Sequence, residues 1–106
     1  MIHLPPMTLS EPQKKYLRGL GHNLKPLIMI GDAGLTDAVK AEFEVTLAHH
    51  ELIKVRVRVG DRKLRDAIIE DIGKSADAEV VQRVGNMALF FRPNPEKKKP
   101  LVIPGL

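Results

Sequence analysis

Residues 52–59 alternate between apolar and cationic side chains, and this alternation constrains the fold more than any other feature of the sequence. The apolar positions are Ile53, Val55, Val57 and Val59, and between them stand Lys54, Arg56 and Arg58. A period of two is that of a β-strand, whose successive side chains point to opposite faces of a sheet. One face of this strand therefore belongs to a hydrophobic core, and the other presents a row of positive charge.

Three amphipathic helices are predicted around this strand. The Ser-Glu-Pro-Gln of residues 10–13 matches the capping box and starts a helix that ends at Gly21, a residue type that favours the left-handed backbone of helix ends. The second helix starts at Thr36 and ends at His49 and His50, and the third starts at the cap Asp61 and ends near Gly73. The predicted inward faces are Gln13, Leu17 and Leu20 in the first helix; Leu35, Val39, Phe43 and Leu47 in the second; and Leu64, Ile68 and Ile72 in the third.

Three further strands are expected. The apolar run of residues 27–30 lies between Pro26 and Gly31 and reads as a buried central strand. Residues 80–84 and 87–91 are separated by Gly-Asn, which suits a two-residue hairpin turn. The element order is then α-β-α-β-α-β-β, which predicts an α/β domain with a four-stranded mixed sheet and right-handed crossovers.

A chain of 106 residues can bury one core, and a single compact domain is expected over residues 8–93. Residues 1–7 read as a short N-terminal extension, and residues 94–106, rich in proline and lysine, as a basic tail that is mobile or loosely docked. The absence of cysteine excludes disulfides and thiolate metal sites. No signal-peptide pattern and no run of ~20 apolar residues is present, so a cytoplasmic protein without a membrane role is expected.

The charge of the chain favours a polyanionic partner. Seventeen lysines and arginines outnumber thirteen acidic residues, for a formal net charge of +4, although a charge of this size also serves solubility. The three cations of residues 52–59 repeat every ~6.6 Å. Like charges in a row mildly destabilise the folded state unless an anion neutralises them. Arg62 and Lys63 extend the basic stretch. The alternative is a solvated strand face whose cations pair with acidic neighbours.

A Gly-x-x-Gly motif, Gly31-Asp32-Ala33-Gly34, lies between the strand of residues 27–30 and the second helix. Glycines at this point let a nucleic-acid backbone approach the peptide N–H groups near a helix N-terminus, as in KH domains. Asp32 in the loop repels phosphate. The alternative is an ordinary turn between a strand and a helix.

The sequence offers no catalytic constellation, metal site or cofactor motif. The four histidines form no His-Glu-x-x-His pattern, and the nearest cluster, His49-His50-Glu51, places adjacent residues about 100° apart on a helix. Ser10 and Ser75 lack nucleophile-elbow surroundings. Alternation puts Phe90 and Phe91 on opposite faces of their strand, where packing is favoured over stacking on a base.

Several separated blocks, in order, resemble the CRM family (chloroplast RNA splicing and ribosome maturation), in particular the stand-alone bacterial YhbY-like proteins. The resemblance covers about residues 8–93. Its blocks are Leu9-Ser10 with Gln13-Lys14, residues 17–22 (Leu-Arg-Gly-Leu-Gly-His), residues 24–26 (Leu-Lys-Pro), residues 30–36 (Ile-Gly-Asp-Ala-Gly-Leu-Thr), residues 49–55 (His-His-Glu-Leu-Ile-Lys-Val), Gly85, and residues 89–93 (Leu-Phe-Phe-Arg-Pro).

The resemblance implies a fold similar to the C-terminal domain of translation initiation factor three, with RNA contacted by the Gly-x-x-Gly loop and the basic surface beside it. It also implies association with ribosomal RNA in precursors of the large ribosomal subunit, which is the role of an assembly factor in ribosome biogenesis. The positions that match the family are Lys14, Lys25, Gly31, Gly34, Lys54 and Arg56. The predicted RNA-binding set also contains Lys15, Arg18, Asp32 and Ala33, and, on the charge argument, Arg58, Arg62 and Lys63.

The leading hypothesis is a monomeric, non-catalytic RNA-binding protein that reads backbone and shape, without a cofactor or a small-molecule substrate. A second hypothesis changes the client to another structured RNA, such as an intron. An RNA-processing enzyme and a protein-interaction module with exposed apolar surface are the alternatives from other classes.

Overall fold

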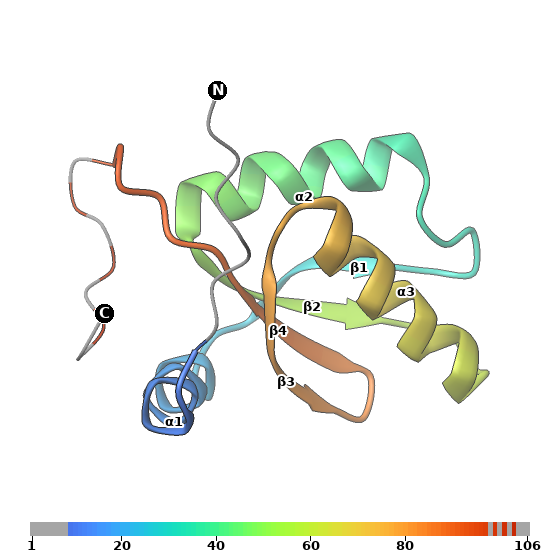
Figure 1. Cartoon of the computed structure of the whole chain (residues 1–106). Coiled ribbons are helices and arrows are strands. Elements are labelled where there is room, and N and C mark those ends of the chain that lie inside the picture. Colours follow the sequence, from blue (N-terminus) through green and yellow to red (C-terminus); the bar gives the residue numbers. More distant parts are fainter. Residues whose placement is uncertain (1–8, 98, 100, 102, 104–106) are drawn as a thin grey trace.

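Helices cover the two faces of a four-stranded sheet in the computed structural model, which describes residues 9–97, 99, 101 and 103 (Figure 1). The helices are α1 (Glu11–Gly21), α2 (Asp37–His50) and α3 (Arg62–Ser75), and the strands are β1 (Pro26–Ile30), β2 (Leu52–Val57), β3 (Glu79–Val84) and β4 (Met87–Phe91). This succession confirms the predicted α-β-α-β-α-β-β order and the α/β class.

The sheet has the strand order β1-β2-β4-β3. β2 runs parallel to β1, to which α2 connects it, and antiparallel to β4, which also pairs antiparallel with β3. The turn between β3 and β4 contains Gly85, whose positive φ of 57° favours glycine. The sheet is therefore mixed and the hairpin is present, as the sequence predicts.

Side-chain caps begin the helices at the predicted residues. Ser10 Oγ accepts from the Gln13 N–H at 3.3 Å, and Gln13 Oε1 accepts from the Ser10 N–H at 2.9 Å, which completes the capping box. Thr36 Oγ1 and Asp61 Oδ1 accept from backbone N–H groups of α2 and α3 at 3.1 and 3.0 Å. Each cap satisfies an N–H group that the first turn of a helix leaves without a partner.

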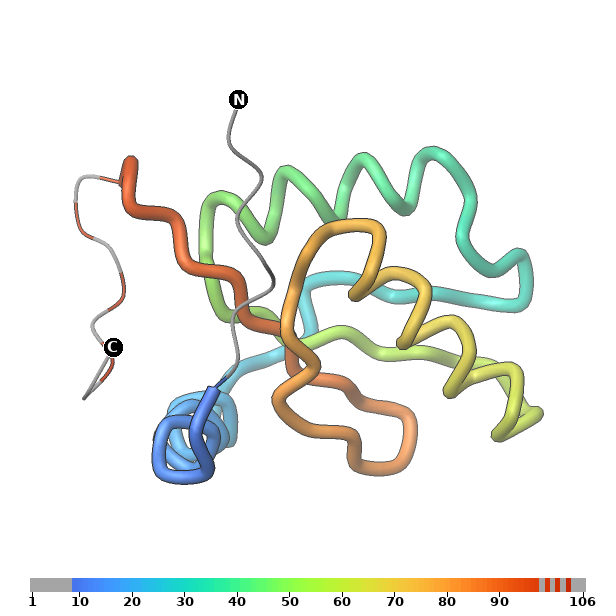
Figure 2. Tube along the Cα trace, in the orientation of Figure 1, coloured from blue at the N-terminus to red at the C-terminus, as the bar shows by residue number. Residues whose placement is uncertain are grey.

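The main hydrophobic core lies between the sheet and the pair α2 and α3, which share one face (Figure 2). Phe43 of α2 and Phe90 of β4 meet edge to face with ring centroids 5.0 Å apart. The strand residues of this core are Ile28, Ile30, Ile53, Val55, Val57, Ala88 and Phe90, and the helix residues are Phe43, Leu47, Ile68, Ile69 and Ile72.

A second, smaller core lies under α1 on the opposite face. It contains Leu9, Leu17, Leu52, Val81, Leu89, Phe91 and Ile103. Phe91 belongs to it and Phe90 to the main core, and both side chains are fully buried, which confirms that this pair packs rather than stacks on a base. Because Leu52 begins β2 and Phe91 ends β4, α1 covers one end of this face and leaves the other end without a helix (Figure 1).

Three predictions about the helices are wrong. Gly21 is the last residue of α1 but is not left-handed, and the cap after it, His22, has right-handed helical angles. Gly21 is instead buried, like Leu17, and a Cβ on it would lie 2.6 Å from Leu89 Cδ2, whereas the neighbouring Leu20 turns outward and is exposed. Leu64 is exposed as well, because the buried face of α3 begins one turn later, at Ile68.

β1 is an edge strand, which corrects the prediction of a buried central strand. Ile28 and Ile30 enter the main core, whereas Leu27 and Met29 are 48% and 55% exposed. A continuous apolar run predicts burial on both faces only if a helix covers each face. Here α2 covers one face of β1, and the smaller core under α1 on the other face contains no residue of β1.

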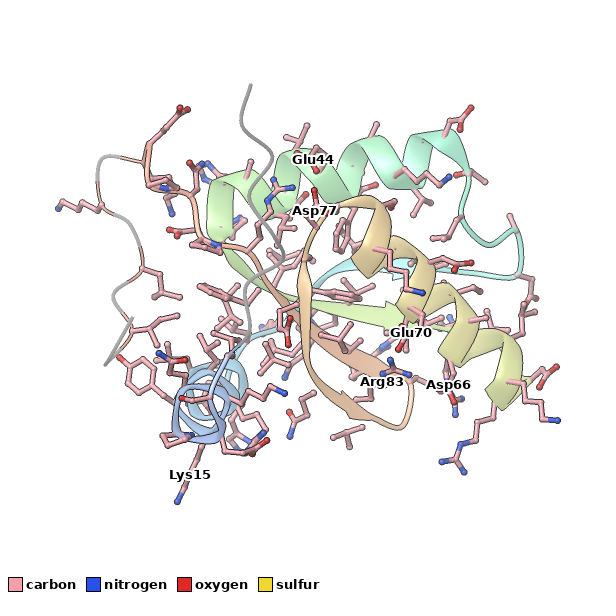
Figure 3. All side chains as sticks on the ribbon, in the orientation of Figure 1. Lys15, Glu44, Asp66, Glu70, Asp77 and Arg83 are labelled. Carbon is pink, nitrogen blue, oxygen red and sulfur yellow. The ribbon has the colours of Figure 1, made fainter. Side chains whose placement is uncertain are left out.

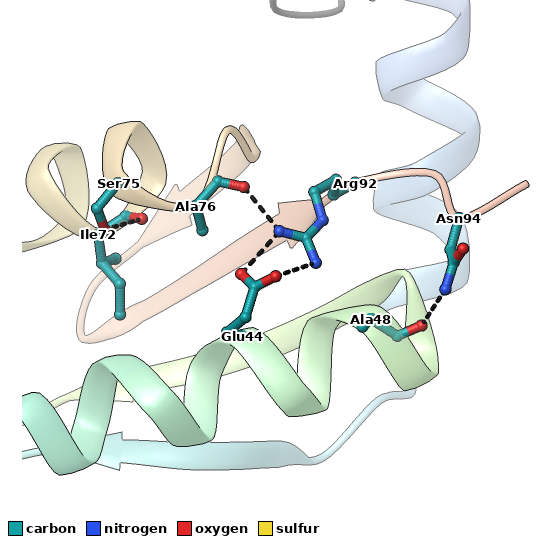
Figure 4. Close-up of polar contacts among 7 residues, drawn as sticks. All are labelled: Glu44, Ala48, Ile72, Ser75, Ala76, Arg92 and Asn94. Carbon is teal, nitrogen blue, oxygen red and sulfur yellow. Dashed lines mark hydrogen bonds and ion pairs between the residues drawn. The ribbon is translucent and has the colours of Figure 1, made fainter. Parts of the chain in front are cut away.

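Arg92, just after β4, links the middle of α2 to the end of α3 (Figure 4). Its guanidinium donates two hydrogen bonds to the Glu44 carboxylate of α2, at 2.8 and 2.9 Å, and one to the Ala76 carbonyl at the end of α3, at 2.9 Å. Asn94 follows and donates from its side-chain amide to the Ala48 carbonyl at 2.9 Å. The chain therefore leaves the sheet along the C-terminal end of α2.

Glu51 holds the residues that come after β4. Its carboxylate is fully buried and accepts from the N–H groups of Asn94 and Leu101, at 2.8 and 2.9 Å, and pairs with Lys97 Nζ at 3.3 Å. Ile103 is buried in the smaller core. Asn94, Lys97, Leu101 and Ile103 therefore contact the domain, whereas Pro95, Glu96 and Lys99 are exposed.

Candidate nucleic-acid interface

The cations of β2 lie on the face of the sheet that α1 only partly covers. The inward positions of β2, Ile53, Val55 and Val57, are fully buried against α2 and α3, so Lys54 and Arg56 point to the other side. We call this uncovered part of the sheet the open face. It consists of the side chains of Leu27, Met29, Lys54, Arg56, Gln82, Val84 and Met87.

Strand register arranges the open face in two rows across the sheet. In one row Lys54 has Leu89 of β4 beside it, which in turn pairs with Gln82 of β3. In the other row Arg56 lies between Met29 and Met87. Directly paired side chains on one face are close neighbours, so apolar groups flank both cations.

No carboxylate among the described residues pairs with the cations of β2. The ion pairs in that part of the chain join acidic groups to Arg18, Arg83, Arg92 and Lys97. Lys54, Arg56 and the exposed Arg58 therefore form a row of positive charge that nothing described on the open face neutralises. A row of this kind attracts a polyanion.

The Gly31–Gly34 loop lies at the end of this row. Gly34 has a φ of +71°, and its N–H donates to the Gly31 carbonyl at 3.0 Å, which closes a tight turn before α2. Asp32 and Ala33, at the tip, are exposed. The Arg58 N–H donates to the Ile30 carbonyl at 2.8 Å, so the last cation of the row stands next to the loop.

The N-terminus of α3 is at this same end of the sheet, because β1 and β2 are parallel and their C-terminal ends coincide. Arg62 and Lys63, in the first turn of α3, are both exposed. Arg65 donates to Asn86 Oδ1 at 3.0 Å and so attaches α3 to the β3–β4 turn. The structure thus gathers the loop, Arg58, Arg62 and Lys63 at one end.

The predicted cations of α1 are at the opposite end of the sheet and do not form one group. Lys14 is half-buried, Arg18 lies 3.9 Å from the Glu11 carboxylate, and Lys25 is exposed just before β1. Lys15 points away from the sheet (Figure 3). Because it points away from the sheet, the Lys15 side chain does not contribute to the open face.

The apolar and amide members of the open face are the residues that sequence reasoning missed. Met29 was assigned to a buried strand, and Gln82, Val84 and Met87 carried no motif. The sequence signal for them is the alternation of the hairpin strands. A residue that follows a main-core position along the strand must point to the other, uncovered side of the sheet.

A groove of about 560 Å³ between α3 and the edge strand β3 has a different character. Glu70, Asp77 and Glu79 line it, against the two cations Lys74 and Arg83. Arg83 is itself engaged by Glu70 and, at 3.9 Å, by Asp66 (Figure 3). This balance of charge disfavours phosphate, so the groove is not part of the candidate interface.

The histidine cluster at the end of α2 is not assembled as a metal site. His49 and His50 are exposed and meet edge to face at 4.7 Å, whereas Glu51 turns inward. Desolvation, followed by the charges of His49 and Lys97, lowers the pKa of His50. Within the described part of the chain no three ligating side chains gather around a common point, and no helix there is long and apolar enough to cross a membrane.

The sequence and the fold both match known proteins. Residues 9–92 match the model of the CRS1/YhbY (CRM) domain. The chain is 46% identical over 91 residues to an RNA-binding protein of Haemophilus influenzae, and the aligned region covers 86% of this chain and 92% of the relative. It is 40% identical over 95 residues to a protein of Pseudomonas aeruginosa named as a probable RNA-binding protein, which covers 90% and 91%. The solution structure of a hypothetical Staphylococcus aureus protein, described as an RNA-binding candidate, superposes with a TM-score of 0.74 at 32% identity and covers 87% of this chain and 95% of that one.

Proposed function

Because this chain belongs to the CRS1/YhbY (CRM) domain family, we propose that it is a non-catalytic RNA-binding protein that associates with ribosomal RNA in precursors of the large ribosomal subunit. The relatives' names support RNA as the ligand. In this proposal the protein acts as a monomer in the cytoplasm, as an assembly factor for the subunit.

The observation that carries the proposal is the row formed by Lys54 and Arg56 on the open face and by Arg58 just after β2, with which no carboxylate of the described residues pairs. A fixed row of cations binds phosphates wherever their spacing matches, whatever the base sequence, so the protein selects RNA by backbone and shape. The Gly31–Gly34 loop, next to Arg58, would bring the peptide N–H groups at the start of α2 to the next phosphates along the strand.

The RNA client is tested by sedimentation of the tagged protein with ribosomal fractions, followed by sequencing of the RNA that crosslinks to it. We expect the protein to migrate with large-subunit precursors and to crosslink to their ribosomal RNA. If the protein crosslinked to an intron or to another structured RNA and did not cosediment with ribosomal fractions, the proposed ribosomal RNA ligand would be wrong, and the proposed RNA-binding activity would stand. Cleavage of the bound RNA by the purified protein would overturn the non-catalytic part.

The loop is tested by Ala33→Lys, which we expect to tighten RNA binding about two- to fivefold at 0.1 M salt by adding one phosphate contact. Position 33 is exposed, and its φ is not among the positive values of the described residues, so lysine fits without strain. The salt dependence of the affinity should steepen by about 0.7 on a log–log scale. Binding is measured by fluorescence anisotropy across a salt series.

The control for this variant is Ala67→Lys, which adds the same charge at an exposed position of α3. Its affinity should rise less than that of Ala33→Lys, with no change of slope. Equal affinities of the two variants at every salt concentration would mean that RNA does not reach the loop, which would then be only a turn.

A further inference from the structure

A hollow of about 230 Å³ lies within the open face, where the end of α1 meets the sheet. Its wall is formed by His22 at the end of α1, Lys54 of β2, Gln82 and Val84 of β3, and Met87, Ala88 and Leu89 of β4. Apart from Ala88, these strand residues belong to the two rows that register sets across the sheet. The hollow is therefore built by the sheet itself and not by a loose segment.

The chemistry of the hollow suits a planar ring with polar edges. Met87 and Leu89 supply an apolar floor, and a thioether makes favourable contacts with aromatic rings. Gln82 offers an amide, with donors and an acceptor together, which is the arrangement that reads the edge of a base. The described wall contains no carboxylate, and Lys54 adds a cation at its rim.

The size and the position of the hollow narrow the ligand further. Its volume is below the ~300–1,000 Å³ of pockets that enclose drug-sized molecules, so it accommodates a ring system rather than a whole nucleotide. Lys54 lines the hollow, and Arg56, which does not line it, pairs with Met87 of its wall, so both β2 cations lie in or next to the hollow. A base inside it would thus have its phosphates beside Lys54 and Arg56.

We propose that this hollow receives one unpaired base of the bound RNA, while the flanking phosphates lie on Lys54 and Arg56. The proposal rests on the proposed RNA-binding function and specifies its substrate class as RNA with accessible single-stranded bases. A duplex hides the faces and Watson–Crick edges of its bases, so it can occupy the cationic row but not the hollow. Methionine and valine here take the part that aromatic rings play in other single-strand binders.

The experiment compares three ligands of equal length, about 12 nucleotides, within the range of known single-strand sites. They are oligouridine, an abasic strand with the same phosphates, and a blunt RNA duplex. Affinities of the wild-type protein and of Gln82→Ala/Met87→Ala are measured by anisotropy at several salt concentrations. The control is Val45→Ala, which removes aliphatic surface at a position of α2 that is 71% exposed and does not line the hollow.

We expect the wild-type protein to bind oligouridine about 5- to 50-fold more tightly than the abasic strand, as one base contact implies. The double variant should lose most of this advantage, while its affinity for the abasic strand and the duplex, and its salt slope, stay within about twofold. Val45→Ala should behave as the wild type. The comparison of oligouridine with the abasic strand uses only the wild-type protein, so it tests the base site even if the double variant folds poorly.

Equal binding of oligouridine and the abasic strand would overturn the base site, and so would an equal loss of affinity of the double variant for all three ligands. In both cases RNA binding itself would stand. Failure of the wild-type protein to bind any of the three ligands or ribosomal RNA would instead overturn the proposed function.

Discussion

Replacing Lys54 and Arg56 together by alanine should weaken RNA binding about 10- to 30-fold at 0.1 M salt and lower the log–log salt slope by about 1.4, because two phosphate contacts are lost. The fold should be kept, since both side chains lie on the open face and the core residues of β2 are untouched. Removal of two like charges from one strand face also relieves mild repulsion. Affinity is measured across a salt series, and thermal unfolding checks the fold.

The matched control is Lys74→Glu on α3, which belongs to the opposite layer of the domain. Both variants lower the formal net charge of +4 by two, so they change long-range attraction equally. We expect Lys74→Glu to lose less than about threefold in affinity, with an unchanged slope. If the two variants lost affinity equally, net charge alone would explain binding, and an unchanged slope in the double variant would exclude β2 from the interface.

Replacing Glu51 by alanine should lower the free energy of unfolding by about 3–4 kcal/mol, the loss typical of breaking a buried charged network. Its carboxylate is fully buried and accepts from two backbone N–H groups, of Asn94 and Leu101, as well as from Lys97. Alanine leaves these donors without their acceptor. For a domain of this size the melting temperature should fall by about 10–20 °C.

The control is Glu96→Ala, which removes an exposed carboxylate from the same stretch and should change stability by less than about 0.5 kcal/mol. Urea unfolding of both variants gives the comparison. A loss of similar size in the two would show that the buried carboxylate does not anchor residues 94–101. In that case, deletion of residues 95–106 should leave the free energy of unfolding unchanged. If Glu51 does anchor this stretch, the same deletion should lower the free energy of unfolding.

Local signals made much of the fold predictable. Ser10 with Gln13, Thr36 and Asp61 each satisfy backbone N–H groups no more than three residues away, so their capping role is visible in the sequence. The hairpin at Gly85 depends on one turn. The alternation of β2 likewise records a local period, and it placed Lys54 and Arg56 together on one face before any tertiary contact was known.

The family resemblance added the related fold and the expected RNA contact of the Gly31–Gly34 loop, but it did not distinguish the two ends of the sheet. Arg58, Arg62, Lys63 and the Gly31–Gly34 loop share an end because β1 and β2 are parallel, which the α2 crossover makes predictable. Lys15 was included with them in the predicted RNA-binding set. Its direction depends on which side of α1 faces the sheet, and that side was predicted wrongly at Leu20.

The sequence by itself determined the helices, the strands and the polarity of β2, because each of these depends on side chains that are neighbours along the chain. Tertiary structure alone decided which face α1 covers, and with it the exposure of Met29 and the hollow beside Lys54. It also decided that Gly21 is a close contact with Leu89, and that Glu51 accepts hydrogen bonds from residues more than 40 positions later. These features come from packing between distant segments, where strand order and helix placement determine which groups meet, and no local period encodes them.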